Sequence, residues 1–240
     1  MPLREVDQLC NNNMESQSHS RRQSYRAIIG ACVGDAAGAV LEFAKNPITE
    51  EAALMAMTMP GGGKHRVGPG QITDDGELTL ALWSGLRGFN PTSSSPDQIM
   101  TSILNAYIQW WQSGPFDIGW TCDLAFELAY YADDLDLSQH YRDVARANSA
   151  SQSNGAMMRA TALATWLAPY LASGQIAVDD VMAFASSECA LSHPNKICQS
   201  ANAIYVLAVC RALAGVDPSD IVKEINGLID ECEHQVQVWW

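Results

Sequence analysis

The sequence predicts an all-α protein with a single helical domain, and three observations support this. First, 48% of the 240 residues are hydrophobic and only 17% are charged, which suits a globular chain with one sizeable core. Second, apolar residues recur at helical spacing, whereas strand-like alternation appears only in residues 235–240. Third, glycine, proline and asparagine, which end helices and form turns, separate the periodic segments. We expect about eight helices.

The expected helices follow one another from residue 24 to residue 232. Residues 1–22 are polar and aperiodic, so we expect a disordered tail there and one domain over residues 23–240. The predicted helices cover 24–43, 75–88, a segment after Pro96 that reaches Trp111, 122–132, a segment from Gly155 to about Leu171, 179–190, 197–214 and 218–232. Residues 44–70 and 133–153 are interpreted as loops.

Charge and cysteine usage exclude several classes of protein. The net charge of −13 argues against a nucleic-acid-binding surface, because phosphate recognition relies on clustered Lys and Arg. The seven cysteines are scattered, with no C-x-x-C spacing, which favours reduced thiols over disulfides or a zinc ribbon. No apolar run is long enough for a membrane span, and no signal-peptide core is visible. We therefore expect a cytoplasmic protein.

The first predicted helix combines small residues with acids. Gly30, Gly34 and Gly38 recur every four residues. Each glycine destabilises a helix by about 1 kcal/mol relative to alanine, so three of them need a reason. We expect that another backbone or a ligand approaches closely at these positions, where a side chain would not fit. Asp35 and Glu42 are two helical turns apart and would share a face. They could also be two solvated acids.

Residues 60–70 form a glycine-rich loop that carries Lys64 and Arg66. It is not a Walker phosphate loop, because residue 58 is Thr rather than Gly and residue 65 is His rather than Ser or Thr. The two basic residues could contact phosphates, but flexibility alone would also explain the glycines.

Thr73, Asp74 and Asp75 lie where this loop meets the next helix. These residue types are common in a first helical turn, where they accept free backbone N–H groups and suit its positive end. Adjacent carboxylates also repel each other unless a cation lies between them, and hard divalent ions prefer oxygen ligands. The triplet is therefore either a helix start alone or a helix start that also holds a metal.

Several separated segments together resemble one known family. In chain order they are GACVGDAAGAVLEF (30–43), GQITDDGELTLAL (70–82), PFDIGWT (115–121), SNGAMMR (153–159) and SHP (192–194). In residues 24–210 their order and separations are similar to those of the ADP-ribosylglycohydrolases, which include the hydrolases that remove ADP-ribose from dinitrogenase reductase. The resemblance implies an all-helical fold with two Mg²⁺ or Mn²⁺ ions at the bottom of an ADP-ribose cleft.

The resemblance also implies roles for individual residues. Thr73, Asp74 and Asp75 would be metal ligands, and Glu42 would activate or orient the water that attacks the ribose anomeric carbon. Asp117, in the D-I-G element, would contact the guanidinium or the ribose. The implied reaction is metal-dependent hydrolysis of the N-glycosidic bond of ADP-ribosylated protein, with arginine favoured over serine as the linkage. The implied partners are ADP-ribosylated protein or ADP-ribose, while the charge and hydropathy given above predict no nucleic-acid and no membrane partner.

Four further residues match the family's substrate pocket. The resemblance implies that Asn154, Gly155 and Arg159 line the pocket and that His193 lies near the substrate phosphates. The other interpretation of His193 is a loop histidine bonded to backbone before a proline.

Two departures from the family pattern leave alternatives open. Gly76 replaces the Thr that follows T-D-D in most relatives, which we expect to cost at most a hydroxyl near the metals. The D-x-D-T element that completes the binuclear site is absent from the sequence. The domain is therefore expected to be C-terminally incomplete. The alternatives to an active enzyme are a non-catalytic relative that binds nucleotide or serves structurally, and a truncated gene product.

Overall fold

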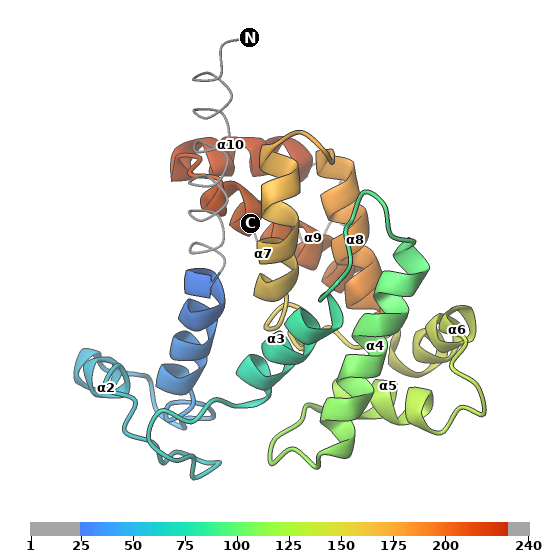
Figure 1. The fold of residues 1–240 in the computed structure, drawn as a ribbon. Helices are drawn as coiled ribbons and strands as arrows, with labels where there is room; N and C mark the ends of the chain where they lie inside the picture. Colours follow the sequence, from blue (N-terminus) through green and yellow to red (C-terminus); the bar gives the residue numbers. More distant parts are fainter. Residues whose placement is uncertain (1–24, 230–240) are drawn as a thin grey trace, which may run out of the picture.

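The computed structural model describes residues 25–229, and its regular elements in that range are helices (Figure 1). This confirms the predicted all-α class. A first helix covers residues 25–38. It is followed by α2 (Glu50–Ala56), α3 (Asp74–Gly85), α4 (Pro96–Gln112), α5 (Trp120–Tyr130), α6 (Leu137–Asn148), α7 (Thr161–Ala172), α8 (Val178–Ala190), α9 (Lys196–Leu213) and α10 (Pro218–Ile229).

Helix α7 lies at the centre of the core. Its sequence is apolar on nearly every side, and Leu163 and Leu167 are fully buried, as expected for a helix surrounded by others. It packs against α3, α8 and α9, and α8 also packs along α9. A smaller apolar cluster between α9 and α10 includes Ile204, Ile221 and Ile225. The core thus includes Leu78 and Leu82 of α3, whereas Thr73, Asp74 and Asp75 at the start of α3 are not part of it.

Helices α3 and α4 approach closely at Gly85. A Cβ atom at this position would lie 2.7 Å from the Cα of Ile103. The Ser102 hydroxyl also donates a hydrogen bond of 2.8 Å to the Gly85 carbonyl. This contact holds α3 against α4, and it fixes the direction in which the α3 N-terminus projects.

Two helices were missed by the sequence prediction. Helix α6 lies inside the predicted loop 133–153, because the residues it buries are His140, Val144 and Asn148. These follow helical spacing, but two of the three are polar, so apolar periodicity does not reveal them. Helix α2 lies inside the predicted loop 44–70, and its seven residues are too few for a periodic pattern.

Other boundaries also differ from the prediction. Residues 155–160 form turns, and α7 begins only at Thr161. The first helix ends at residue 38, so Glu42 lies in the turns that follow and does not share a helical face with Asp35. The predicted tail 1–22 and the strand-like residues 235–240 lie outside the described residues. None of the described helices is long and apolar enough to cross a membrane.

Candidate functional site

A cleft of about 970 Å³ opens between the first helix, the N-termini of α3 and α5, the turn at residues 153–155 and α9. Most of the residues singled out in the sequence line it: Glu42, Thr73, Asp74, Asp75, Asp117, Asn154, Gly155 and His193. Five segments that are separated in the chain thus contribute to one cavity. The position of these residues agrees with the proposed site, whereas their individual roles stay predictions.

The N-terminus of α3 forms one wall of the cleft, and Asp35 caps it. One carboxylate oxygen of Asp35 accepts hydrogen bonds from the backbone N–H groups of Thr73 (2.8 Å) and Gly76 (2.9 Å). The other accepts from the Thr73 hydroxyl at 2.7 Å. The first helix therefore holds the start of α3 through a carboxylate that satisfies free helical N–H groups.

Gly76 is required by this cap. A Cβ atom at Gly76 would lie 2.7 Å from the Asp35 carboxylate and 2.9 Å from the Ile72 side chain. The sequence suggested that this residue only lacks a hydroxyl near the metals. In this structure a side chain at residue 76 would instead displace Asp35 from the α3 N-terminus, so the glycine is part of the packing between the two helices.

Five carboxylates face the cleft, and among the described residues that line it none is Lys or Arg. The acids are Asp35, Glu42, Asp74, Asp75 and Asp117. Burial and the neighbouring acid Asp117 raise the pKa of Asp74 to about 6, and burial together with Asp35 raises that of Asp75 to about 6. Bringing these negative charges together is costly, and a bound cation would relieve that cost.

The start of α3 fits an oxygen-preferring divalent cation. The Thr73 hydroxyl donates its hydrogen to Asp35 and accepts the Asp75 backbone N–H at 3.4 Å, so one lone pair stays available to a metal. Asp74 lies at the same helix start and is mostly buried, and Asp75 is half-buried. Thr73, Asp74 and Asp75 thus offer one hydroxyl and two carboxylates, the donor set that Mg²⁺ and Mn²⁺ accept.

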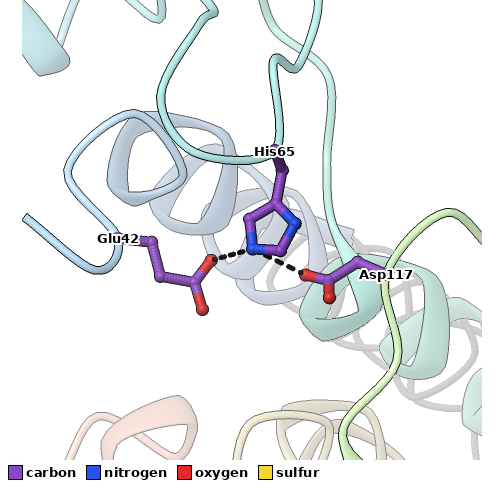
Figure 2. Close-up of side chains that lie close together, drawn as sticks. All are labelled: Glu42, His65 and Asp117. Carbon is purple, nitrogen blue, oxygen red and sulfur yellow. Dashed lines mark ion pairs between the residues drawn. The ribbon is translucent and has the colours of Figure 1, made fainter.

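Asp117 and Glu42 meet at the cleft rim together with His65 (Figure 2). The His65 Nε2 atom lies 3.6 Å from an Asp117 carboxylate oxygen and 3.8 Å from one of Glu42. Burial, followed by the nearby charge of Asp117, raises the pKa of Glu42. The D-I-G loop is also anchored to α3, because the Gly119 N–H donates to Asp74 at 3.3 Å. Glu42 and Asp117 therefore line the same cleft as Thr73, Asp74 and Asp75, and their roles stay predictions.

His193 is buried on the opposite wall of the cleft, within a chain of hydrogen bonds. Arg159 donates to the Ser192 hydroxyl at 2.8 Å, so Ser192 has its own hydrogen free for His193 Nδ1, also at 2.8 Å. This leaves Nε2 protonated, and it donates to the Ser153 hydroxyl at 2.8 Å. Burial, and secondly the Arg159 charge, lower the pKa of His193 to about 3. His193 is therefore a neutral hydrogen-bond donor at neutral pH.

Arg159 was expected to line the pocket, but the structure places it in the core. Its guanidinium is fully buried and donates to Glu188 at 2.7 Å and to the Gly155 carbonyl at 3.0 Å. It also lies over the Tyr107 ring, 4.5 Å from the centroid. Burial opposes its charge, but Glu188 outweighs that cost and keeps the pKa of Arg159 above its ordinary value. Arg159 therefore lies behind the cleft wall and contacts it through Gly155, Cys122 and the Ser192 hydroxyl.

The glycines of the cleft differ in what they contact. A Cβ atom at Gly155 would lie 2.9 Å from the His193 ring and 3.0 Å from Cys122 Sγ, so this position requires glycine. Gly34 and Gly38 line the cleft, and no described atom lies within 4 Å of a Cβ built on either. The expected close approach by a backbone is therefore not found within residues 25–229.

Two residues of the site were missed in the sequence. His65 stands in the loop of residues 60–70 without a motif of its own, and only the tertiary fold brings it to Glu42 and Asp117. Asp35 was noticed as an acid of the first helix, but its contact with α3 spans 38 residues of chain. The sequence signal that could have found it is the acid within G-D-A-A-G, the segment that also leads to Glu42.

Comparisons with known proteins agree with this cleft and fold. The model of the ADP-ribosylglycohydrolase family matches residues 16–238. A putative ADP-ribosyl glycohydrolase of Acanthamoeba polyphaga mimivirus is 29% identical over 204 residues, which cover 82% of this chain and 57% of that protein. The ADP-ribosyl-[dinitrogen reductase] glycohydrolase of Rhodospirillum rubrum is 38% identical over 97 residues, covering 40% of this chain and 31% of the relative.

A solved structure shares the fold. It is described as an ADP-ribosylglycohydrolase-related protein complex and aligns with a TM-score of 0.62 at 23% identity, over 88% of this chain and 62% of its own. The chain therefore spans less than two thirds of the length of these relatives. Because the family model covers most of the sequence, the chain belongs to the ADP-ribosylglycohydrolase family, a class of glycosidase-type hydrolases.

Proposed function

We propose that this protein hydrolyses the N-glycosidic bond between ADP-ribose and an arginine of a modified protein, with the help of divalent cations. The observation that carries the proposal is the acidic cleft, in which Thr73, Asp74 and Asp75 face Glu42 and Asp117. Family membership supports the reaction class, and a similar protein of Rhodospirillum rubrum is named for removing ADP-ribose from dinitrogen reductase.

In this proposal Glu42 acts on the attacking water. Its carboxylate reaches the cleft from a turn and is 40% exposed, so a water molecule can approach it. The burial and neighbouring acids that raise its pKa make Glu42 a stronger base than a free carboxylate. Mg²⁺ or Mn²⁺ held by Thr73, Asp74 and Asp75 would make bound water more acidic and orient the ribose. Glu42 accepts the proton that this water loses.

Asp117 binds the guanidinium side of the substrate. Its side chain is 18% exposed and lies at the cleft rim near Glu42. A carboxylate pairs well with the planar guanidinium of arginine, through two parallel hydrogen bonds. A seryl linkage offers no such group. Asp117 therefore favours arginine-linked ADP-ribose.

The opposite wall binds the nucleotide portion. Asn154 is exposed in the turn that precedes Gly155, and the absence of a Cβ at Gly155 lets the chain pass close to His193. His193 donates to the Ser153 hydroxyl and positions it, so the Ser153 hydroxyl and the Asn154 side-chain amide are the groups that can donate to phosphate oxygens. This wall would hold the pyrophosphate without a cationic side chain.

The test is release of ADP-ribose from a protein ADP-ribosylated on arginine, measured with Mg²⁺, with Mn²⁺ and with a chelator. Asp74→Asn and Asp75→Asn should abolish release, and Glu42→Gln should slow it by about 10²–10⁴-fold. Asp133→Asn alters an exposed acid before α6 and serves as the control. Release that is insensitive to the chelator, or undiminished in Asp74→Asn, would refute the proposal.

A second candidate function is binding of ADP-ribose without hydrolysis. The hydrogen-bonding wall around Ser153, Asn154 and His193 favours it, because these groups could hold a nucleotide with no cation present. Calorimetry separates the two functions. Binding of ADP-ribose that is independent of Mg²⁺, in a protein without turnover, would support the binding protein.

A further inference from the structure

Three side chains from different segments converge at the acidic cleft, close to the start of α3 but from other parts of the chain. Glu42 follows the first helix, His65 comes from the glycine-rich loop, and Asp117 precedes α5 (Figure 2). One donor atom from each lies within 4.8 Å of the other two. His65 Nε2 points between the two carboxylates, at 3.8 Å from Glu42 and 3.6 Å from Asp117.

The distances around His65 Nε2 exceed those of hydrogen bonds. An N–H···O bond measures about 2.7–3.2 Å between heavy atoms, so neither carboxylate is hydrogen-bonded to Nε2, although both lie at ion-pair distance (Figure 2). Yet the Nε2 atom is buried and has no hydrogen-bond partner among the described residues. Ligands that share one ion at about 2.1 Å lie roughly 3–4 Å apart, which agrees with both separations. A cation between the three groups would satisfy the nitrogen and both acids.

Local structure holds the His65 ring in this position. The ring lies between Phe43 and Phe116, with centroid separations of 5.6 and 6.5 Å. Its loop passes close to the end of the first helix, because a Cβ at Gly63 would lie 2.8 Å from the Ala39 carbonyl oxygen. The imidazole is therefore placed by packing on two sides, before any ligand binds.

The donor set differs from that of the α3 site. Thr73, Asp74 and Asp75 supply oxygen alone, which suits Mg²⁺ and Mn²⁺. An imidazole nitrogen with two carboxylates suits Zn²⁺ and related transition ions, and three protein ligands leave a fourth position open. We propose that Glu42, His65 and Asp117 form a separate site for a divalent transition ion of the Zn²⁺ class.

Such an ion would inhibit the hydrolase, a consequence that rests on the proposed function. A Glu42 carboxylate bound to an ion cannot accept a proton from water, and a bound Asp117 cannot pair with a guanidinium. The same three side chains would join the glycine-rich loop to the D-I-G loop across the cleft rim. Zn²⁺ at this site would thus lower the hydrolase activity that Mg²⁺ at the start of α3 supports.

Binding of the ion is tested directly, without reference to activity. Calorimetry with Zn²⁺ and the visible absorption of bound Co²⁺ are recorded in the full chain with Mg²⁺ in excess. The wild type should bind one ion at this site and show a Co²⁺ spectrum with an imidazole ligand. His65→Gln should remove that spectrum and weaken Zn²⁺ binding by at least about 10–100-fold.

Arg66→Gln, on the same loop and exposed, is the matched control and should bind as the wild type does. Glu42→Gln provides a second variant at an exposed ligand, and circular dichroism verifies folding. Unchanged Zn²⁺ binding in both His65→Gln and Glu42→Gln, or no binding by the wild type, would overturn the site. Because these readouts need no substrate, an inactive protein that binds Zn²⁺ through His65 would contradict the proposed function and leave this site standing.

Discussion

The Thr73 hydroxyl donates a hydrogen bond to Asp35 across 2.7 Å, which ties the start of α3 to the first helix. The same carboxylate accepts the Thr73 and Gly76 backbone N–H groups. Asp35 therefore orients a proposed metal ligand and caps its helix at once. Groups that hydrogen-bond to metal ligands fix the ligands' orientation, and replacing them lowers metal affinity.

Asp35→Asn should weaken Mg²⁺ binding by about 10–100-fold while the protein stays folded. An amide keeps one oxygen acceptor, but its NH₂ group cannot accept from the Thr73 hydroxyl or from the backbone N–H groups. Calorimetry of Mg²⁺ binding measures the effect, with Asp133→Asn as the control at an exposed acid. Equal affinities for wild type and Asp35→Asn would show that Asp35 does not orient Thr73 for metal binding.

His193 should make the protein sensitive to acid. Its folded-state pKa is about 3, against an ordinary value of 6.5, so the unfolded chain binds a proton in this range that the folded protein excludes. The free energy of unfolding therefore falls as pH drops from 6.5 towards 3, by at most about 1.4 kcal/mol per pH unit.

His193→Gln removes this titration and keeps a hydrogen-bond donor. Between pH 7 and pH 4.5 it should lose about 2 kcal/mol less stability than the wild type does, as measured by urea unfolding at both pH values. The carboxyl groups titrate in both proteins, and their contribution cancels in the comparison. Parallel pH dependence would mean that His193 is not buried as a neutral ring.

Arg159→Met should destabilise the fold by about 3–5 kcal/mol, because it leaves the Glu188 carboxylate buried without its cation. The double variant Arg159→Met/Glu188→Met removes both charges. The double variant should lose less unfolding free energy than the two single variants lose together, by about 2 kcal/mol or more. This holds although the Tyr107 hydroxyl then loses its hydrogen bond to Glu188. Denaturant unfolding of the four proteins gives the coupling energy, and additive costs would exclude a direct interaction.

Gly85→Ala should destabilise the protein by about 1–3 kcal/mol, because the added methyl group would meet the backbone of Ile103. Gly227→Ala, in α10, is the matched control: its added methyl group meets no described atom within 4 Å. Since alanine favours helix over glycine, Gly227→Ala should stabilise by about 0.5–1 kcal/mol. Thermal unfolding measures both, and equal shifts would contradict the close packing of α3 against α4.

Much of the fold could be read from the sequence because the central helices bury long apolar side chains. Helix α7 is apolar on nearly all sides, and α4 repeats apolar residues at helical spacing through Ile99, Ile103 and Tyr107. Helix α6 could not be read, because His140 and Asn148 are buried there through hydrogen bonds to distant backbone. Their burial depends on partners that sequence periodicity cannot supply.

The sequence by itself determined the family, the all-helical fold and the acids of the cleft, because these depend on residue types in a fixed order. Only the tertiary structure decided what each polar side chain contacts. The structure places Arg159 in the core beside Glu188 rather than in the cleft, and it places His65 next to Glu42 and Asp117. The physical reason is that a buried ion pair or a cluster of metal-ligating side chains forms only where segments far apart in the chain come close in space. The spacing of residues along the sequence does not encode those distances.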